Sequence, residues 1–239
     1  MTATPCLSVV IPAFNEALRL PRYLDEVVSF LHTRGEPWEV IVVDDGSTDG
    51  TAAVVDQVAE RYPAVRLFPL SRNRGKGAAV RAGMLAARGA LRLFTDADGA
   101  TPIAELKRLE AALGTDGIAI GSRALPAPGV VVRARRHRVT AGRIFTGLVN
   151  RLGLRGIADS QCGFKLFTAA AAESLFGRLE TSGLAFDVEV LLRARKAGWR
   201  IVEVAVNWTD QAGGTVSVLT SGPGMLTEIV QTWWRVGRR

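Results

Sequence analysis

Two aspartates separated by one residue follow an apolar segment, in Thr95-Asp96-Ala97-Asp98-Gly99. In an extended segment, residues i and i+2 lie on the same side of the chain, so the two carboxylates can converge on one point. Carboxylate, phosphate and water oxygens are the ligands that Mg²⁺ and Mn²⁺ prefer. The alternative is a polar turn that leaves a strand, because Asp and Gly are also common turn residues. The other polar segments of the chain distinguish between a metal site and a turn.

A second pair of aspartates, Asp44-Asp45, also follows an apolar segment. Asp44 is expected to contact a ligand. Asp45 has two about equally supported interpretations. It contacts a ligand, or it lies at the start of the next helix, where negative charge is favoured. The neighbouring Ser47 and Thr48 are expected to cap that helix.

Two further polar clusters follow apolar segments, Pro12–Glu16 and Arg72–Lys76. The second is a basic loop with glycines at a helix N-terminus, where phosphate groups commonly bind. It lacks the spacing of a Walker A loop. Solvated surface charge is the alternative interpretation of its basic residues.

Apolar segments alternate with helical periodicity over the first hundred residues, and this alternation defines the expected fold. Strands are predicted over residues 7–11, 38–43, 65–70 and 90–95, with amphipathic helices in the three intervals between them. The pattern predicts an α/β domain with a mostly parallel sheet flanked by helices. In such sheets the ligand crevice lies beyond the carboxyl ends of the strands. All four polar clusters fall at those ends, which favours one common site and a metal role for the aspartates.

The second half of the chain is less regular. The sequence predicts helices over 102–113, 139–152 and from 185, strands over 117–123 and 201–206, and a loop over 126–132. The segment 159–167 passes from polar to apolar around Gly163, without an assigned element. No internal repeat or low-complexity linker separates the halves, so a single domain over residues 1–239 is expected.

The composition favours an anionic partner. The 239 residues include 30 Lys and Arg against 23 Asp and Glu, a net charge of +7, which suits nucleic acid, a membrane surface or a phosphorylated substrate. No nucleic-acid motif is present and the arginines do not interleave with aromatics, so nucleic acid is not expected as a partner. The basic cluster Arg133–Arg138 can bind an acidic acceptor, or it is a solvated loop.

Several features bear on the cellular setting. Cys6 and Cys162 have no metal-site spacing and form no disulfide framework, which indicates a reducing, cytoplasmic environment. No secretory signal and no run of ~18 apolar residues is present, so a membrane contact is expected to be peripheral, on the cytoplasmic face. In the tail 222–239, helical spacing places Leu226, Ile229, Val230 and Trp233 on one face, with Trp234 adjacent. Such a helix suits a membrane interface, or it packs on the domain with its tryptophans in the core.

Four motifs stand in order and at consistent spacing: Ser8–Glu16, Val42–Thr51, Asn73–Gly77 and Thr95–Pro102. Together they resemble family 2 glycosyltransferases of the GT-A fold. Three later motifs are Asp159–Phe167, Phe186–Glu189 and Val206–Trp208. They look like the dolichyl-phosphate β-glucosyltransferase branch, whose relatives include dolichyl-phosphate mannose synthases.

The resemblance implies a single GT-A, Rossmann-like domain. Residues 1–123 would be its nucleotide-sugar-binding half, and residues 124–239 its acceptor-binding half with a C-terminal amphipathic helix. The implied reaction is metal-dependent transfer of a hexose, with inversion, from a nucleotide-sugar to a polyprenyl phosphate. UDP-glucose is the favoured donor and a GDP-hexose the alternative. A GT-A transferase acting on a soluble or glycan hydroxyl is the alternative function.

The resemblance also assigns residues. The nucleotide-sugar would be bound by Pro12, Phe14, Glu16, Asp44, Lys76 and Asp96. Asp98 would hold Mg²⁺ or Mn²⁺ on the diphosphate, and Asp159 would be catalytic. The acceptor would be bound by Arg123, Arg133, Arg135, Arg136, Arg138 and Gln161. A phosphate monoester, with a second pKa of about 6, needs little help from a base. Asp159 would then orient the acceptor or balance charge, whereas a hydroxyl acceptor would require it as a base.

Overall fold

The first four strands of the structure lie where the sequence predicts them. The computed structural model describes residues 4–115, 117–134, 147, 149–211 and 218–238. The strands are β1 (Leu7–Ala13), β2 (Trp38–Asp44), β3 (Val65–Pro69) and β4 (Leu91–Thr95). They pair in parallel in the order β3-β2-β1-β4. β1 and β2 are buried along nearly their whole length, as expected for a parallel sheet covered on both faces.

The strand β7 (Phe164–Thr168) corrects the sequence analysis, which assigns no element to this segment. It lies antiparallel between β4 and β5 (Gly117–Ser122), and β8 (Arg200–Ala205) completes the sheet in the order β3-β2-β1-β4-β7-β5-β8. The segment is short and contains a lysine, so its strand identity depends on the edges of β4 and β5. Because β7 runs against β4, the residues before it lie at the carboxyl end of β4.

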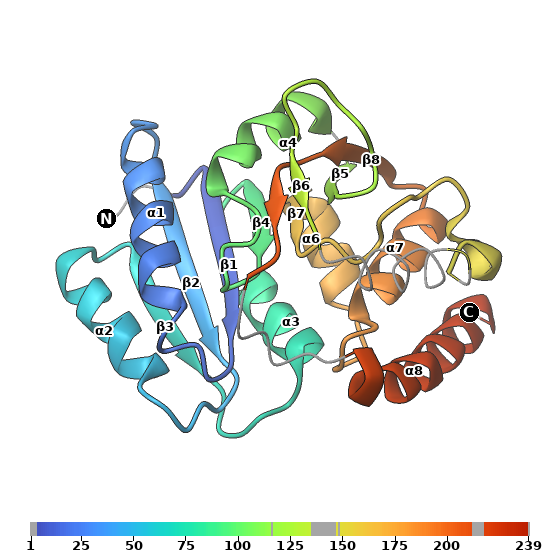
Figure 1. The fold of residues 1–239 in the computed structure, drawn as a ribbon, viewed down its shortest axis with the longest axis horizontal. Helices are drawn as coiled ribbons and strands as arrows, with labels where there is room; N and C mark the ends of the chain where they lie inside the picture. Colours follow the sequence, from blue (N-terminus) through green and yellow to red (C-terminus); the bar gives the residue numbers. More distant parts are fainter. Residues whose placement is uncertain (1–3, 116, 135–146, 148, 212–217, 239) are drawn as a thin grey trace.

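Helices cover both faces of the sheet (Figure 1). One core joins the sheet to α1 (Leu20–His32), α2 (Thr51–Arg61) and α4 (Leu106–Leu113). The other joins it to α3 (Lys76–Ala86), α6 (Ala169–Phe176) and α7 (Phe186–Lys196). Alternate residues of the strands contribute to the two cores, as the pleat requires. The prediction of an α/β fold with a mostly parallel sheet flanked by helices is confirmed.

Shorter elements precede α4 and lie among the later strands. They are the 3-10 turn η1 (Ile103–Glu105), the π-helical turn η2 (Asn150–Leu154) and a parallel pair of two-residue strands, β6 (Val132–Arg133) and β9 (Trp208–Thr209). The loop predicted over 126–132 therefore ends in a strand, because Val132 and Arg133 pair with β9, which is distant in the sequence. Most of the helix predicted over 139–152 lies outside the described residues.

The last helix, α8 (Val218–Arg238), packs on α7 at one end of the molecule (Figure 1). Ile229, Thr232 and Val236 are buried against the domain. Trp233 and Trp234 are 47% and 52% exposed, so the interpretation that places them in the core is wrong. The predicted apolar face is therefore split, because its Ile229 packs against the domain whereas its Val230 and Trp233 point outward. Within the described ranges, every helix is too short or too polar to cross a bilayer.

Candidate active site

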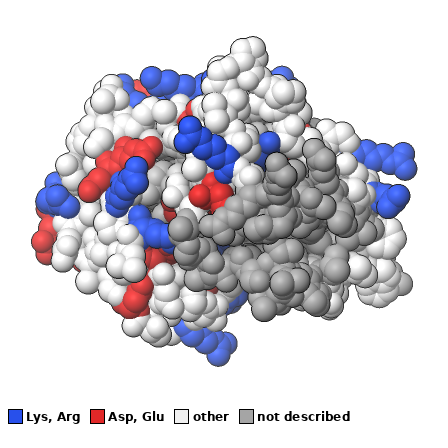
Figure 2. Space-filling model, in the orientation of Figure 1, with Lys and Arg blue, Asp and Glu red and all other residues white. Residues whose placement is uncertain are grey.

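The carboxyl ends of β1, β2 and β4 meet at one edge of the sheet and bring the predicted donor-site residues to it. Asp44 ends β2, and Asp96 directly follows β4. Pro12 is a buried residue of β1, while Phe14 and Glu16 follow that strand and are half-buried. Lys76 begins α3 from the same edge. Figure 2 shows acidic and basic side chains close together near the middle of one face of the molecule.

Lys76 and Asp96 form an ion pair, with 2.6 Å between Nζ and Oδ1. Burial alone would lower the pKa of the Lys76 ammonium, but the charges of Asp96 and Asp187 raise it overall. The lysine therefore stays positively charged. The Asp96 backbone N–H donates to the carbonyl of Gly163 at 3.0 Å. A Cβ on Gly163 would collide with the Asp96 carboxylate, so only glycine leaves that carboxylate in place.

Asp98 lies beside this pair and fits a divalent cation. Burial and the negative charge of Asp96 raise the pKa of Asp98, whose Oδ1 accepts a hydrogen bond from the Ala100 N–H at 3.0 Å. Burial also raises the pKa of Glu16, even though Arg19 donates to its carboxylate. Crowded carboxylates with raised pKa values are the environment that a cation relieves.

The described residues contain no group of three or more His, Cys, Asp or Glu that could hold a metal ion. A cation here would thus depend on one or two carboxylates and on substrate phosphate, the usual arrangement for Mg²⁺. Asp98, with Asp96 beside it, would hold the ion, which when bound neutralises charge on a departing diphosphate.

Asp44 and Asp45 both organise backbone at this edge, and neither caps α2. Asp44 Oδ1 accepts from the Ser47 N–H at 3.0 Å. The Asp45 carboxylate accepts from the N–H groups of Arg74 and Gly75 at 2.8 and 2.9 Å. Asp45 therefore shapes the basic glycine loop, a role that the sequence analysis does not include.

The start of α2 also differs from the prediction. Ser47 Oγ accepts from the Asn15 N–H, and the Thr48 N–H donates to Asn15 Oδ1, both at 2.9 Å. Asp49, which accepts from the Thr51 N–H at 2.9 Å, supplies the hydrogen bond expected of Ser47 or Thr48. Ser47 and Thr48 instead join the loop after β2 to the loop after β1. The sequence does not predict this contact, because it depends on β1 and β2 being neighbours in the sheet.

Asp159 and Arg123 form a bidentate pair at the end of β5. Arg123 Nε lies 2.6 Å from Asp159 Oδ2, and its Nη2 lies 2.8 Å from Oδ1. The backbone N–H of Arg123 and that of Gln161 add two further hydrogen bonds to the carboxylate, at 3.0 and 3.1 Å. The Glu203 carboxylate holds the Asp159 N–H at 2.7 Å. Four donors thus use about all the acceptor positions of an ionised carboxylate.

The charge of Asp159 follows from these contacts. Burial alone would raise the pKa of Asp159, but the hydrogen bonds and charge of Arg123 lower it overall. The Arg123 guanidinium also lies 5.4 Å from the ring centre of Trp208. Arg123 is therefore fixed by a carboxylate and an aromatic ring, with 33% of its side chain exposed. The geometry suits Asp159 to orienting this arginine and balancing its charge.

A buried ion pair, Lys165 with Asp187, lies beneath the site, and the sequence analysis missed it. Their side chains are 1% and 5% exposed, with 2.6 Å between Nζ and Oδ1. Lys165 lies opposite Phe94 in the sheet and also donates to the carbonyl of Cys162 at 2.5 Å. Burial raises the pKa of Asp187 against the opposing charge of Lys165. A charged residue within each of two apolar segments, around positions 165 and 187, is the sequence feature that could have predicted this buried ion pair.

The predicted acceptor residues are only partly placed. Arg123 is at the site, and the Gln161 backbone contacts Asp159. Arg133 is an exposed residue of β6. Arg135, Arg136 and Arg138 lie outside the described residues, so their role stays a prediction.

The fold and this charged edge of the sheet define a glycosyltransferase: the sequence model of Glycosyl transferase family 2 matches residues 8–176, and the chain belongs to that family. It is 40% identical to the dolichyl-phosphate beta-glucosyltransferase of Dictyostelium discoideum, over 96% of this chain and 74% of the relative. Identity to the protein of the same name is 43% in Drosophila melanogaster, with the same coverage, and 42% in Homo sapiens, over 88% of this chain and 69% of the relative. The resemblance to this branch is therefore confirmed.

Solved structures support the fold. The glucosyl-3-phosphoglycerate synthase from Mycobacterium tuberculosis, in complex with Mn²⁺, UDP-glucose and phosphoglyceric acid, superposes with a TM-score of 0.74. It is 19% identical and covers 96% of this chain and 80% of its own. At this identity the likeness concerns the fold alone.

Proposed function

We propose that this family 2 glycosyltransferase moves glucose from UDP-glucose to a dolichyl or other polyprenyl phosphate, with a divalent metal ion and inversion at the sugar. The observation that carries the proposal is the edge formed by Lys76, Asp96 and Asp98 in a chain 40–43% identical to named dolichyl-phosphate beta-glucosyltransferases. The mycobacterial synthase that shares the fold was solved with Mn²⁺ and UDP-glucose, which supports the donor and the metal.

The residues of the charged edge are assigned to different parts of the nucleotide-sugar donor. Asp44 and Glu16, at the ends of β2 and β1, are the residues proposed for the nucleoside. Lys76 is a cation that stays charged beside Asp96, so it suits the diphosphate. Asp98 would hold Mg²⁺ or Mn²⁺ there. Preorganised positive charge at a leaving group is generally among the largest contributions to catalysis.

The acceptor chemistry follows from the pair of Arg123 and Asp159. A guanidinium fixed in position is well suited to a phosphate monoester. A phosphate oxygen would attack the anomeric carbon while the bond from that carbon to the UDP oxygen breaks, and UDP would leave with the electron pair. No proton has to be removed from a dianionic phosphate. Asp159, whose four acceptor positions are occupied, would hold Arg123 in place, whereas a hydroxyl acceptor would need a base.

Replacing Asp159 with asparagine is expected to cost about tenfold in kcat/KM with a lipid phosphate, because Arg123 loses its counter-charge but the nucleophile is already ionised. Loss of a general base typically costs 10²–10⁴-fold, which is the expectation for a hydroxyl acceptor. Rates with both acceptors, measured from pH 5 to pH 8, check this. A carboxyl with a lowered pKa is ionised throughout that range and protonates only as the pH falls below it. With the lipid phosphate, the fall in rate below about pH 6 comes from protonation of the phosphate, so it should be the same in the variant and in the unaltered chain. An equal loss of rate with both acceptors would contradict the role assigned to Asp159.

The protein would approach its lipid acceptor from the cytoplasmic side as a peripheral protein. Val230, Trp233 and Trp234 on the outer side of α8 are 59%, 47% and 52% exposed. Aromatic side chains at this position suit the headgroup region of a bilayer, and the net charge of +7 favours anionic lipid.

One experiment tests these proposals together. The protein is incubated with membrane lipid extract and a panel of radiolabelled nucleotide-sugars, with and without EDTA, and the vesicles are then sedimented. The expected result is label in organic-extractable material from UDP-glucose alone, lost with EDTA, and protein that sediments with the vesicles. Label in water-soluble glycan would favour the transferase with a hydroxyl acceptor. Transfer unaffected by EDTA would contradict the metal, and protein that stays in the supernatant would contradict the membrane contact.

A further inference from the structure

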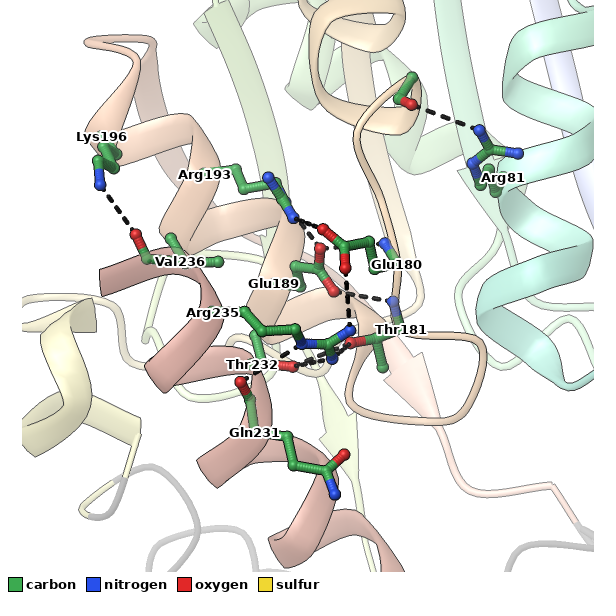
Figure 3. Close-up of polar contacts among 11 residues, drawn as sticks. Arg81, Glu180, Thr181, Glu189, Arg193, Lys196, Gln231, Thr232, Arg235 and Val236 are labelled. Atoms are coloured by element: carbon green, nitrogen blue, oxygen red, sulfur yellow. Dashed lines mark hydrogen bonds and ion pairs between the residues drawn. The ribbon is translucent and has the colours of Figure 1, made fainter. Parts of the chain in front are cut away.

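Helix α8 contacts a short segment that lies between it and the donor site. This segment, Glu180–Ala185, is the second part of the connection between α6 and α7. The Glu189 carboxylate of α7 holds its beginning, accepting from the N–H groups of Glu180 and Thr181 at 3.1 and 2.8 Å (Figure 3). The segment is therefore anchored to α7 at one end, and its remaining contacts decide where the rest of it lies.

The inner face of α8 supplies several of those contacts. Thr232, which is fully buried, has its hydroxyl 2.9 Å from that of Thr181. Arg235 donates to the same Thr181 oxygen at 3.1 Å, and its Nη1 lies 3.4 Å from a Glu180 carboxylate oxygen (Figure 3). One turn earlier, Glu228 Oε2 accepts from the Ala185 N–H at 3.1 Å. A Cβ on Gly183 would collide with the Glu228 carboxylate, so this side chain of α8 rests directly on the backbone of the segment.

On its other side, the same segment packs against the turn that carries Lys76. The Ser182 carbonyl accepts from the Ala78 N–H at 3.2 Å. A Cβ on Gly75 would lie 2.5 Å from the Ser182 oxygen, and one on Gly77 would lie 2.5 Å from the Thr181 oxygen. Glycine on each side of Lys76 thus permits backbone-to-backbone contact that any larger residue would prevent.

Lys76 lies between these two glycines, with its ammonium on Asp96. The Asp45 carboxylate holds the opposite side of the turn through the Gly75 N–H. The turn is therefore clamped between Asp45 and the segment Glu180–Ala185, and α8 backs the segment. A shift of α8 would remove one side of the clamp.

We propose that α8 is a positioning element of the donor site, and that Glu228 is its principal positioning residue, setting the Lys76 ammonium through the segment Glu180–Ala185. The inference rests on the proposed function in that Lys76 binds the diphosphate of the donor. The helix that carries exposed tryptophans on its outer face would then hold the donor loop with its inner face. Contact of α8 with a membrane surface and binding of the donor would then be linked through α8 itself.

The test is a double-mutant cycle on the full chain, read by calorimetric binding of UDP in the presence of Mn²⁺. Glu228→Ala is expected to raise the dissociation constant about fivefold, and Lys76→Ala about tenfold or more. If Glu228 acts through Lys76, the double variant should bind no more weakly than Lys76→Ala alone, because sites that act through one another are not additive. Glu228→Gln retains an oxygen that can accept from Ala185 and should restore most of the binding. Gln231→Ala, at an exposed position of the same helix, is the matched control and should bind UDP normally.

A second measurement separates this inference from the proposed function. Amide hydrogen exchange without any nucleotide should be faster over residues 75–78 in Glu228→Ala than in the unaltered chain, with a similar unfolding temperature in both. Unaltered exchange there, or additive losses in the cycle, would overturn the role of α8. Absence of UDP binding by the unaltered chain, together with faster exchange in Glu228→Ala, would instead overturn the proposed donor and leave the coupling supported.

Discussion

Replacing Asp98 with asparagine should lower the rate of glucosyl transfer by a factor on the order of 10²–10³, the usual effect of removing one electrostatic group from the centre of charge development. The amide oxygen can still accept the hydrogen bond from Ala100, so the turn after β4 is retained. What is lost is a negative charge that would hold a divalent ion on the diphosphate. Steady-state kinetics across a Mn²⁺ titration, and binding of Mn²⁺ with UDP, measure the effect.

The same variant should be no less stable than the unaltered chain in the absence of metal. Burial and the charge of Asp96 raise the pKa of Asp98, which means that its ionised form is disfavoured in the folded protein. Asparagine removes this unfavourable charge. Conversely, Mn²⁺ with UDP should raise the unfolding temperature of the unaltered chain and not of the variant, because a ligand stabilises the state that binds it.

Asp56→Asn is the control, since Asp56 is exposed on α2. It removes the same charge from the chain without touching the edge of the sheet, and it should bind Mn²⁺ and UDP normally. Normal metal affinity in Asp98→Asn would rule out the metal role of this carboxylate. An equal loss of Mn²⁺ and UDP binding in the two variants would indicate an effect of net charge and not of a specific site.

Replacing Asp187 with asparagine should destabilise the protein by about 3–5 kcal/mol, the usual range for removing one partner of a buried ion pair. Lys165 would be left with a side chain that is 1% exposed and without its counter-charge. Its remaining hydrogen bond, to the Cys162 carbonyl, does not neutralise it. Urea unfolding followed by circular dichroism measures the loss, and Asp25→Asn on the exposed side of α1 provides the comparison.

The double variant Lys165→Met with Asp187→Leu separates stability from activity. Apolar residues of similar volume often replace a buried ion pair without loss of stability, so most of the lost free energy of unfolding should return. Activity should not return fully, because the Asp187 carboxylate attracts the Lys76 ammonium and an apolar residue cannot, although Lys76 stays protonated beside Asp96. Full recovery of both would show that the pair has only a structural role, and a small loss in Asp187→Asn alone would show that the pair is not the buried contact described.

The amino-acid sequence alone determined the parallel half of the sheet and the edge of the sheet at which the donor site is proposed. Strands β1 to β4 are short, mostly apolar segments, largely buried in β1, β2 and β4 and half-buried in β3, so the local pattern suffices to predict them. Carboxyl ends of parallel strands necessarily meet at one edge. This rule predicts that Glu16, Lys76, Asp96 and Asp98 lie together, and the family motifs add their assignment to a nucleotide-sugar.

The tertiary structure decided the features that depend on which segments become neighbours. β7 is a strand because β4 and β5 leave a gap between them, and its antiparallel direction places Gly163 against Asp96. Asp159 binds Arg123 from 36 positions away. The exposed side of α8 depends on where it packs on α7. None of these pairings leaves a periodic signal in the chain, because each is set by contacts between segments and not by the residues of one segment. For the turn Thr95–Gly99, the sequence indicated a metal site, whereas the structure showed what surrounds each aspartate: Lys76 beside Asp96, and Asp98 next to it with its raised pKa.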